Sequence, residues 1–226
     1  MEARPLQTSI TLLLEHVDPE LSRADRELYP ERIPEHIPFS LTLQYPWVPA
    51  AEVTDTDVER LRQFFTSRPQ LEFDLTHVSE FPGAVAYAVP EPDEELRAMM
   101  RALWAMYPQF PPYGQPGLDP PPHATLGRYE GPTPITFEQA RARVEPLLPA
   151  SCVITEATLQ EEYELDRMRI RETFPFTALS GRTARRQQAK SIEGSRLSPR
   201  HEPPVRDVAM RVQALGATAN AVLTNG

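Results

Sequence analysis

Two short stretches decide the fold of this chain, FSLTLQYPW at residues 39–47 and PPHATLGRYEG at residues 121–131. Each holds the same pattern of a polar residue, a spacer, a threonine and a leucine, at residues 40–43 (SLTL) and at residues 123–126 (HATL). Side chains two positions apart on a β-strand share a face. We therefore predict two strands, each with its polar residue and threonine on one surface and its alternate residues in a core.

The residues that this pattern selects as a candidate site are Ser40, Thr42, His123 and Thr125. Hydroxyl groups donate hydrogen bonds to phosphate oxygens, and an imidazole takes up or releases a proton near neutral pH. Two such strands side by side would form a surface suited to handling phosphate. The structural alternatives are a buried strand histidine bonded to backbone and ordinary β-branched strand threonines.

The periodicity of the remaining chain predicts alternating strands and helices. Alternation of apolar residues predicts strands at 9–16, 71–78, 84–89, 152–159 and 168–174, the last two paired, and helical spacing predicts helices at 21–28, 54–65, 94–106 and 136–148. Phe81-Pro82-Gly83 is a hairpin signature, and residues 108–122, rich in Pro and Gly, predict an irregular loop. The strand, loop and helix order after Phe39 recurs after His123, which indicates two related halves.

The two stretches resemble the paired motifs of the two-histidine phosphoesterases, the 2′-5′ RNA ligase family, which carry His-x-Thr/Ser and a hydrophobic residue twice. Residues 45–47 (YPW) resemble the segment that follows the first motif, and Gly127-Arg128 resembles the pair that follows the second. The similarity extends to a mid-chain hairpin at residues 71–90 and a last strand ending at residues 171–176. In all it spans about residues 9–178.

This resemblance implies an α+β fold with two pseudo-symmetric lobes, in which antiparallel sheets line a central cleft and helices lie outside. It implies hydrolysis or formation of 2′,5′ or 2′,3′-cyclic phosphodiester bonds in RNA ends or nucleotides, without metal or cofactor. In-line displacement at phosphorus needs a base on the attacking oxygen and an acid on the leaving oxygen, and two histidines supply them. The resemblance assigns catalysis to His123, Thr125 and Thr42, with Ser40 at the first histidine position.

Ser40 is the departure from the family pattern, because a serine hydroxyl cannot hold a proton near neutral pH. Two hypotheses stay open: an enzyme with His123 as its one strong acid or base, and a pseudoenzyme that binds a nucleotide or phosphate ligand without turnover. Two other histidines are weaker candidates for the missing role. His36 lies four residues before Ser40, roughly 13 Å away in an extended chain, and His77 precedes a hairpin turn, where a structural role is favoured.

Arginines near the motifs offer further candidates. Arg128 is a candidate substrate-binding residue, but it has the wrong parity for the His123 face unless Gly127 forms a bulge; otherwise a surface ion pair is expected. Arg167, Arg169 and Arg171 alternate along one strand and predict either a basic rim or, in preference, a solvated face.

The charge distribution limits the partners that the chain can bind. The net charge is −9, and residues 181–226 hold eight Lys or Arg against three Asp or Glu, so this segment carries +5 and the remainder −14. An acidic body disfavours grip on an extended phosphate backbone. We therefore expect a small nucleotide or an RNA end as substrate, bound by a monomer.

Composition argues against several other classes of protein. One cysteine excludes an intrachain disulfide, and the five histidines lack metal-ligand spacing, so no metal is predicted. The apolar run 10–14 is too short for a membrane span and lacks signal-peptide features, which favours a cytoplasmic protein. We predict a two-lobed domain over residues 1–179 and a mostly disordered basic tail over 180–226, with at best a helix near 205–215.

Overall fold

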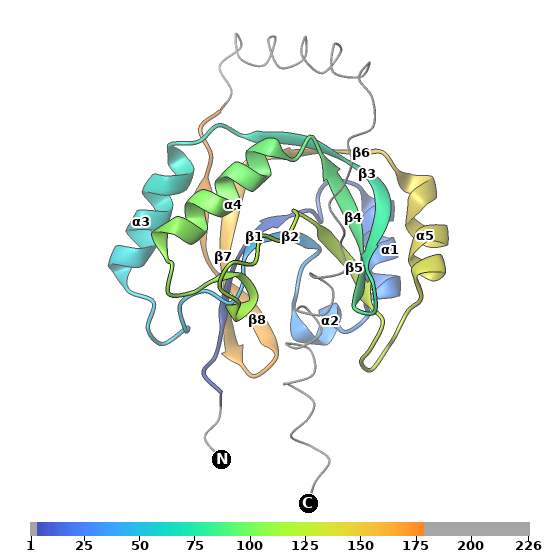
Figure 1. The fold of residues 1–226 in the computed structure, drawn as a ribbon, viewed down its shortest axis with the longest axis horizontal. Coiled ribbons are helices and arrows are strands. Elements are labelled where there is room, and N and C mark those ends of the chain that lie inside the picture. The colour runs from blue at the N-terminus through green and yellow to red at the C-terminus, as the bar shows by residue number, and fades with distance from the viewer. Residues whose placement is uncertain (1–3, 179–226) are drawn as a thin grey trace, which may run out of the picture.

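Two four-stranded antiparallel sheets form the frame of the part of the chain that the computed structural model describes, residues 4–178 (Figure 1). The first sheet has the order β2 (Ser40–Gln44), β1 (Thr8–Leu13), β7 (Glu156–Glu164) and β8 (Arg167–Pro175). The second has the order β5 (Ala124–Arg128), β4 (Val85–Glu91), β3 (Leu71–Phe81) and β6 (Ala150–Ile154). The predicted α+β class is confirmed.

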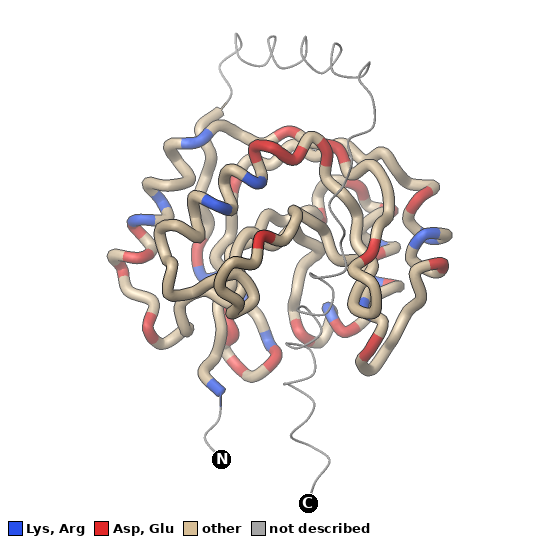
Figure 2. The backbone as a smooth tube through the Cα atoms, in the orientation of Figure 1, with Lys and Arg blue, Asp and Glu red and all other residues tan. Residues whose placement is uncertain are grey.

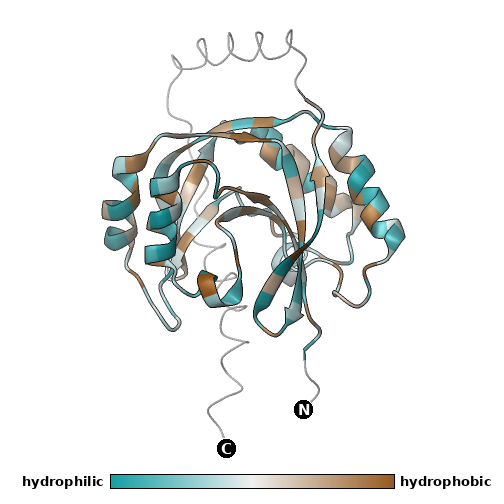
Figure 3. Cartoon of the chain, turned by 180° about the vertical axis from the view of Figure 1, so that it is seen from behind, coloured by the Kyte–Doolittle hydropathy of each residue, from teal (hydrophilic) through white to brown (hydrophobic). Residues whose placement is uncertain are grey.

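The helices lie on two flanks of this frame, as Figure 1 shows. The first flank holds α3 (Asp55–Thr66), which contacts β8, and α4 (Glu94–Met106), which contacts β2. The second holds α1 (Pro19–Leu28) and α5 (Phe137–Val144), which contact each other and the second sheet. Each of these four helices presents apolar residues to the core, and Figure 3 shows both hydrophobic and hydrophilic positions along the helices.

The remaining helical segments are short. They are α2 (Arg32–Glu35) and two 3₁₀ turns, η1 (Pro112–Gly114) and η2 (Glu145–Leu147). The helix predicted for residues 136–148 therefore ends at Val144, and the chain continues as a 3₁₀ turn that contains Pro146. A proline removes a backbone donor and is incompatible with continuing the α-helix past it.

The helix that follows each motif strand begins with the same local structure. Thr54 caps α3 and exchanges hydrogen bonds with Asp57, and Thr136 caps α5 and exchanges them with Gln139, so both helices start with a capping box. A capping box satisfies two backbone donors that the first helical turn leaves without partners. The recurrence of strand, loop and helix predicted from the sequence is thus present in the fold.

The prediction of one strand across residues 152–159 is wrong, because the chain changes sheets within it. β6 pairs with β3 in the second sheet, and β7 pairs with β1 and β8 in the first. The parity of the buried residues reverses at this point, from Cys152 and Ile154 to Ala157 and Leu159. This reversal marks the break, since buried residues of a continuous strand keep one parity.

Both sheets contribute to one buried cluster. Leu41 and Leu43 of β2 and Ala124 and Leu126 of β5 belong to it, and none is more than 1% exposed. No helix within residues 4–178 is long and apolar enough to cross a membrane. The tail predicted for residues 180–226 lies outside the described residues.

Candidate functional site

The two motif strands lie side by side although they belong to different sheets. β2 and β5 are edge strands, and Cα atoms of the two lie within 8 Å of each other. Because the leucines and Ala124 of both motifs enter the same core, Ser40, Thr42 and Thr125 point away from it. We call this surface of β2 and β5, together with His123 at the start of β5, the motif face.

His123 is held by a backbone acceptor. Its Nδ1 lies 2.8 Å from the carbonyl oxygen of Pro121. A carbonyl oxygen only accepts hydrogen bonds, so Nδ1 carries the ring proton of the neutral imidazole and Nε2 carries the lone pair. Nε2 in turn lies 3.5 Å from the hydroxyl of Tyr113, which the loop between α4 and β5 brings to this point. The ring is thus oriented as a base with Nε2 as its basic atom.

Aromatic rings enclose His123 more tightly than the sequence predicts. The imidazole meets the rings of Phe81 and Tyr87 edge to face, with centroid distances of 5.0 and 5.4 Å, and the residue is only 7% exposed. Burial lowers the pKa of His123, although the Pro121 carbonyl opposes this shift. The packing of His123 is thus that of the buried, backbone-bonded histidine given as the structural alternative, and its imidazole is neutral at neutral pH.

The hydroxyl groups of the motif face have free hydrogen-bonding capacity. Thr42 and Thr125 are partly exposed, and Ser40 is 9% exposed. Within residues 4–178, the hydroxyls of these three residues make no hydrogen bond to another protein group. They therefore remain available as donors to a ligand oxygen.

Arg128 lies on the motif face because β5 contains a bulge. This is the condition under which the sequence analysis expected Arg128 to share a face with His123. Tyr87 pairs with Thr125, whereas Val85 pairs with Arg128, so the register shifts by one residue between them. Cross-strand partners share a face, and Val85 and Tyr87 are on the same face of β4, so Thr125 and Arg128 are too. The alternative of a surface ion pair is not found among the described residues. Arg128 is exposed, and its guanidinium lies 5.3 Å from the centroid of the Tyr29 ring.

Gly127 in this bulge is required by close packing. A Cβ at this position would approach the side chain of Ile135 to 3.0 Å or less and the carbonyl oxygen of Leu28 to 3.2 Å. The Gly-Arg pair after the second motif thus has two physical functions. The glycine lets α1 and the segment before α5 approach β5, and the bulge turns Arg128 to the motif face.

Arg32 is a residue of this region that the sequence analysis missed. Its Nη2 donates to the backbone oxygen of Thr125 at 2.6 Å and its Nη1 to that of Pro38 at 3.2 Å, so it links β5 to the segment entering β2. Arg32 is 6% exposed, and its Nε lies 3.0 Å from the carboxylate of Asp25. Nothing in its local sequence marks it, since the contacts come from residues far along the chain.

The two other candidate histidines have different partners. Nδ1 of His36 lies 3.3 Å from the hydroxyl of Tyr163, and Nδ1 of His77 lies 2.9 Å from the hydroxyl of its neighbour Thr76. Among the interactions of residues 4–178, neither histidine contacts His123 or a motif hydroxyl. The contacts of both histidines are thus with neighbouring hydroxyls away from the motif residues.

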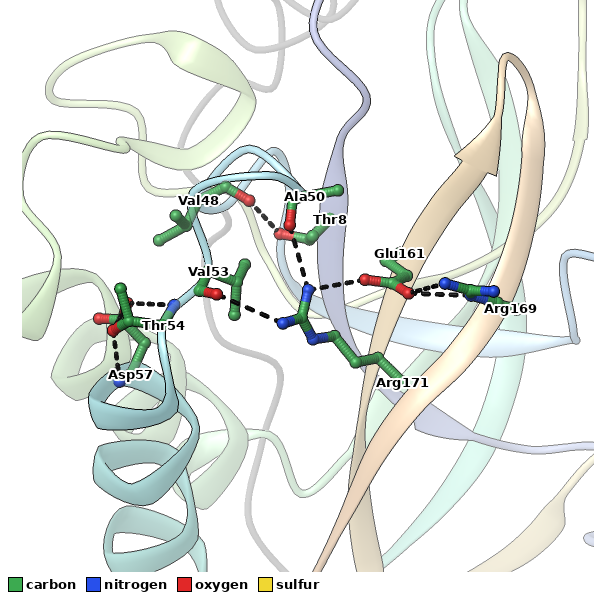
Figure 4. Close-up of polar contacts among 9 residues, drawn as sticks. All are labelled: Thr8, Val48, Ala50, Val53, Thr54, Asp57, Glu161, Arg169 and Arg171. Atoms are coloured by element: carbon green, nitrogen blue, oxygen red, sulfur yellow. Dashed lines mark hydrogen bonds and ion pairs between the residues drawn. The ribbon is translucent and has the colours of Figure 1, made fainter.

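The arginines of β8 do not form a free basic rim. Arg169 and Arg171 both bind the carboxylate of Glu161, at 2.7 to 2.8 Å, and Arg171 also donates to the carbonyl oxygens of Ala50 and Val53 (Figure 4). Arg167 lies 3.7 Å from a carboxylate oxygen of Glu164. Across the described chain, cationic residues are scattered among acidic ones, as Figure 2 shows.

Comparisons with known proteins give a match to a family model and matches to several solved structures. A crystal structure of a phosphoesterase aligns at 17% identity and a TM-score of 0.48, over 77% of this chain and 99% of that chain. The structure of E. coli LigT complexed with 3′-AMP aligns at 16% identity and a TM-score of 0.47, with the same coverage. No curated protein matches the chain. Residues 13–165 match the family model of the 2′-5′ RNA ligase superfamily, which is more than half of the chain.

Proposed function

This chain belongs to the 2′-5′ RNA ligase superfamily, and from that premise we propose that it acts on 2′,5′ or 2′,3′-cyclic phosphodiester bonds of nucleotides or RNA ends. The proposed catalytic residues are His123, Thr42 and Thr125. Arg128 is the proposed cationic contact to the substrate, and Ser40 contributes a hydrogen bond and no proton transfer. The chemistry uses no metal.

The observation that carries this proposal is the orientation of His123. With Nδ1 bound to the Pro121 carbonyl, Nε2 is the basic atom, and burial keeps the ring neutral. A neutral imidazole on the same face as two uncommitted threonine hydroxyls and an exposed guanidinium combines a base with donors for phosphate oxygens.

A second candidate function is binding of a nucleotide or phosphate ligand without turnover. The observations that favour it are the serine at position 40 and the small exposure of His123, which is 7%. Such a protein would keep the donors of the motif face and have no use for a base. Removal of these donors would then lower the affinity for the ligand, and there would be no turnover to change.

The test is a turnover screen in the presence of a chelator. Purified chain is incubated with 2′,3′-cyclic nucleotides and with 2′,5′-linked oligonucleotides, and 3′,5′-linked oligonucleotides serve as the comparison substrate. We expect hydrolysis of at least one of the first two classes and none of the third. Binding of these ligands without any product would establish the second candidate instead.

A matched pair of variants ties the activity to the motif face. Thr42→Val combined with Thr125→Val removes two hydroxyls while keeping β-branched shape, and we expect a loss of about 10²-fold or more in turnover. Thr133→Val removes an exposed hydroxyl in the turn before α5 and should leave turnover unchanged. Equal turnover in wild type, the double variant and Thr133→Val would exclude the motif face as the site.

A further inference from the structure

The motif face has one base and no evident acid. His123 can accept a proton from an attacking water, but the leaving ribose oxygen also needs a proton, and Ser40 cannot supply it efficiently. The hydroxyl of Tyr113 lies 3.5 Å from Nε2 of His123. The contact is longer than an ordinary hydrogen bond, as catalytic contacts often are before a ligand binds.

The loop holds Tyr113 in a specific conformation. Its backbone lies in the left-handed region, with φ 53° and ψ 27°, which is uncommon for a residue other than glycine. Its N–H donates to the carbonyl oxygen of Tyr45 at 2.7 Å, directly after β2. Tyr113 is therefore attached through its backbone to the end of the first motif, while its hydroxyl faces the histidine of the second. Strained residues held in this way cluster at functional sites.

The protonation states of the pair are complementary. Burial, with a smaller contribution from the nearby Tyr45, raises the pKa of Tyr113 to about 12, so the phenol keeps its proton at neutral pH. Burial lowers the pKa of His123, so its Nε2 stays unprotonated. The resting pair is thus a phenol that can donate and an imidazole that can accept.

We infer that Tyr113 is the general acid of the site and exchanges protons directly with His123, in the role that the family pattern gives to a second histidine. This inference rests on the proposed function. Water attacks phosphorus, and its proton goes to Nε2 of His123 as the new P–O bond forms. The bond from phosphorus to the ribose oxygen breaks, and that oxygen takes the proton of Tyr113. The imidazolium then returns its proton to the tyrosinate, which restores both groups.

The first test is Tyr113→Phe, which keeps the ring and removes the hydroxyl. We expect turnover of a 2′,3′-cyclic nucleotide to fall by about 10²-fold, with the affinity for the product nucleotide changed less than about twofold. Tyr163→Phe is the matched control, because it removes another hydroxyl in contact with a histidine, His36, at 3.3 Å. That control should keep full turnover.

The second test separates proton donation from a structural role. Incorporation of 3,5-difluorotyrosine at position 113 keeps the size of the side chain and makes the phenol more acidic. If Tyr113 is the acid, the alkaline limb of the pH profile of kcat moves to lower pH, because the donor loses its proton earlier. A phenol that only positions His123 would leave this limb in place.

The outcomes distinguish the inference from the proposed function. An active wild-type chain whose Tyr113→Phe variant keeps its turnover, or whose fluorinated form keeps its pH profile, overturns the role of Tyr113 and leaves the proposed function standing. A wild-type chain that turns over no phosphodiester overturns both. Loss of turnover in the variant together with the shifted profile supports both.

Discussion

Ser40 occupies a largely buried position at the start of β2. The residue is 9% exposed and pairs across the sheet with Leu13 of β1, on the face that also carries Thr42. A larger side chain there has to extend along the motif face. That geometry makes the position a direct test of whether the two motifs act together.

We predict that Ser40→His raises hydrolysis of a 2′,3′-cyclic nucleotide, because an imidazole exchanges protons near neutral pH more readily than the Tyr113 phenol does; a positioned acid or base contributes at most roughly 10² to 10⁴-fold. The gain should vanish when His123→Ala is added, since groups that act as a unit are not additive. Ser40→Ala should change turnover little. Ser151→His places a histidine on an exposed strand position of the second sheet and should give no gain. A gain that survives the loss of His123 would contradict the pairing of the motifs.

A second prediction at this scale concerns the stability contribution of His123. Because its ring contacts Phe81 and Tyr87, we expect His123→Ala to cost about 1 to 3 kcal/mol in the free energy of unfolding, besides abolishing turnover. This cost is larger than the value below about 1 kcal/mol that suits an exposed residue. Urea denaturation measures it, and a cost near zero would mean that the ring packs loosely.

The pH dependence of that contribution follows from the lowered pKa of His123. The unfolded chain binds a proton at this residue near its ordinary pKa of 6.5, whereas the folded chain does so only at lower pH. The contribution is therefore full above pH 6.5 and is lost as the pH falls. Denaturation of wild type and His123→Gln at pH 7.5 and 5.5 should show the difference between them changing in favour of the variant at the lower pH.

At the scale of elements, the link between α2 and the two motif strands depends on a buried ion pair. Arg32 and Asp25 are 6% and 0% exposed, and Arg32 also binds the carbonyl oxygens of Thr125 and Pro38. Removing one partner of a buried pair leaves an uncompensated charge. The ion pair thus orients Arg32, which joins β5 to the segment that precedes β2.

We predict that Arg32→Ala destabilises the fold by about 3 to 5 kcal/mol, the range for breaking a buried ion pair. Arg23→Ala, which removes an exposed ion pair of α1 with Glu20 and Glu27, should cost below about 1 kcal/mol. The measurement is the midpoint of denaturant unfolding for both variants. Equal costs would show that Arg32 does not link the strands.

The contribution of Asp25 to the free energy of unfolding depends on pH with the opposite sign to that of His123. Burial raises the pKa of Asp25 from 3.8 to about 6, against the attraction of Arg32 and with a small contribution from Glu15. The folded chain therefore holds a proton that the unfolded chain has released, and this stabilisation is present below pH 4 and lost between about pH 4 and 6. Relative to Asp25→Asn, wild type should lose up to about 3 kcal/mol across that window.

At the scale of the whole molecule, the described residues contain two four-stranded sheets and a last segment that is bonded back to them. The backbone N–H of Thr177 donates to the carbonyl oxygen of Arg68 at 2.8 Å, and its carbonyl oxygen accepts from Gln70 at 3.1 Å. A cut between this contact and residue 180 keeps every element of the core.

We accordingly predict that the chain cut after Leu179 folds and keeps the binding and turnover of the full chain. The melting temperatures of the two proteins should agree within about 4 °C, which corresponds to less than about 1 to 2 kcal/mol for a domain of this size. A cut after Thr173, which removes the end of β8, is the comparison that should unfold. If the chain cut after Leu179 melts at a much lower temperature than the full chain, residues 180–226 contribute to the stability of the fold.

Local pattern alone indicated the motif strands and the parity of their residues. The alternation in residues 39–47 and 123–126 predicts which side chains enter the core, because a strand places alternate residues on opposite faces. It also selected Ser40, Thr42, His123 and Thr125 as the candidate site, which remains a prediction. These features depend on residues close together in the chain, where the backbone geometry itself links pattern to structure.

Contacts between segments far apart in the chain were decided by the tertiary structure. The exchange of sheets between β6 and β7, the burial of His123 against Phe81 and Tyr87, and the link made by Arg32 all join segments tens of residues apart. Tyr113 belongs to this group as well, since a Pro-rich loop has no periodicity that predicts where a side chain points. Such contacts arise from how the sheets and loops pack, and the same local sequence in another fold would place these groups elsewhere.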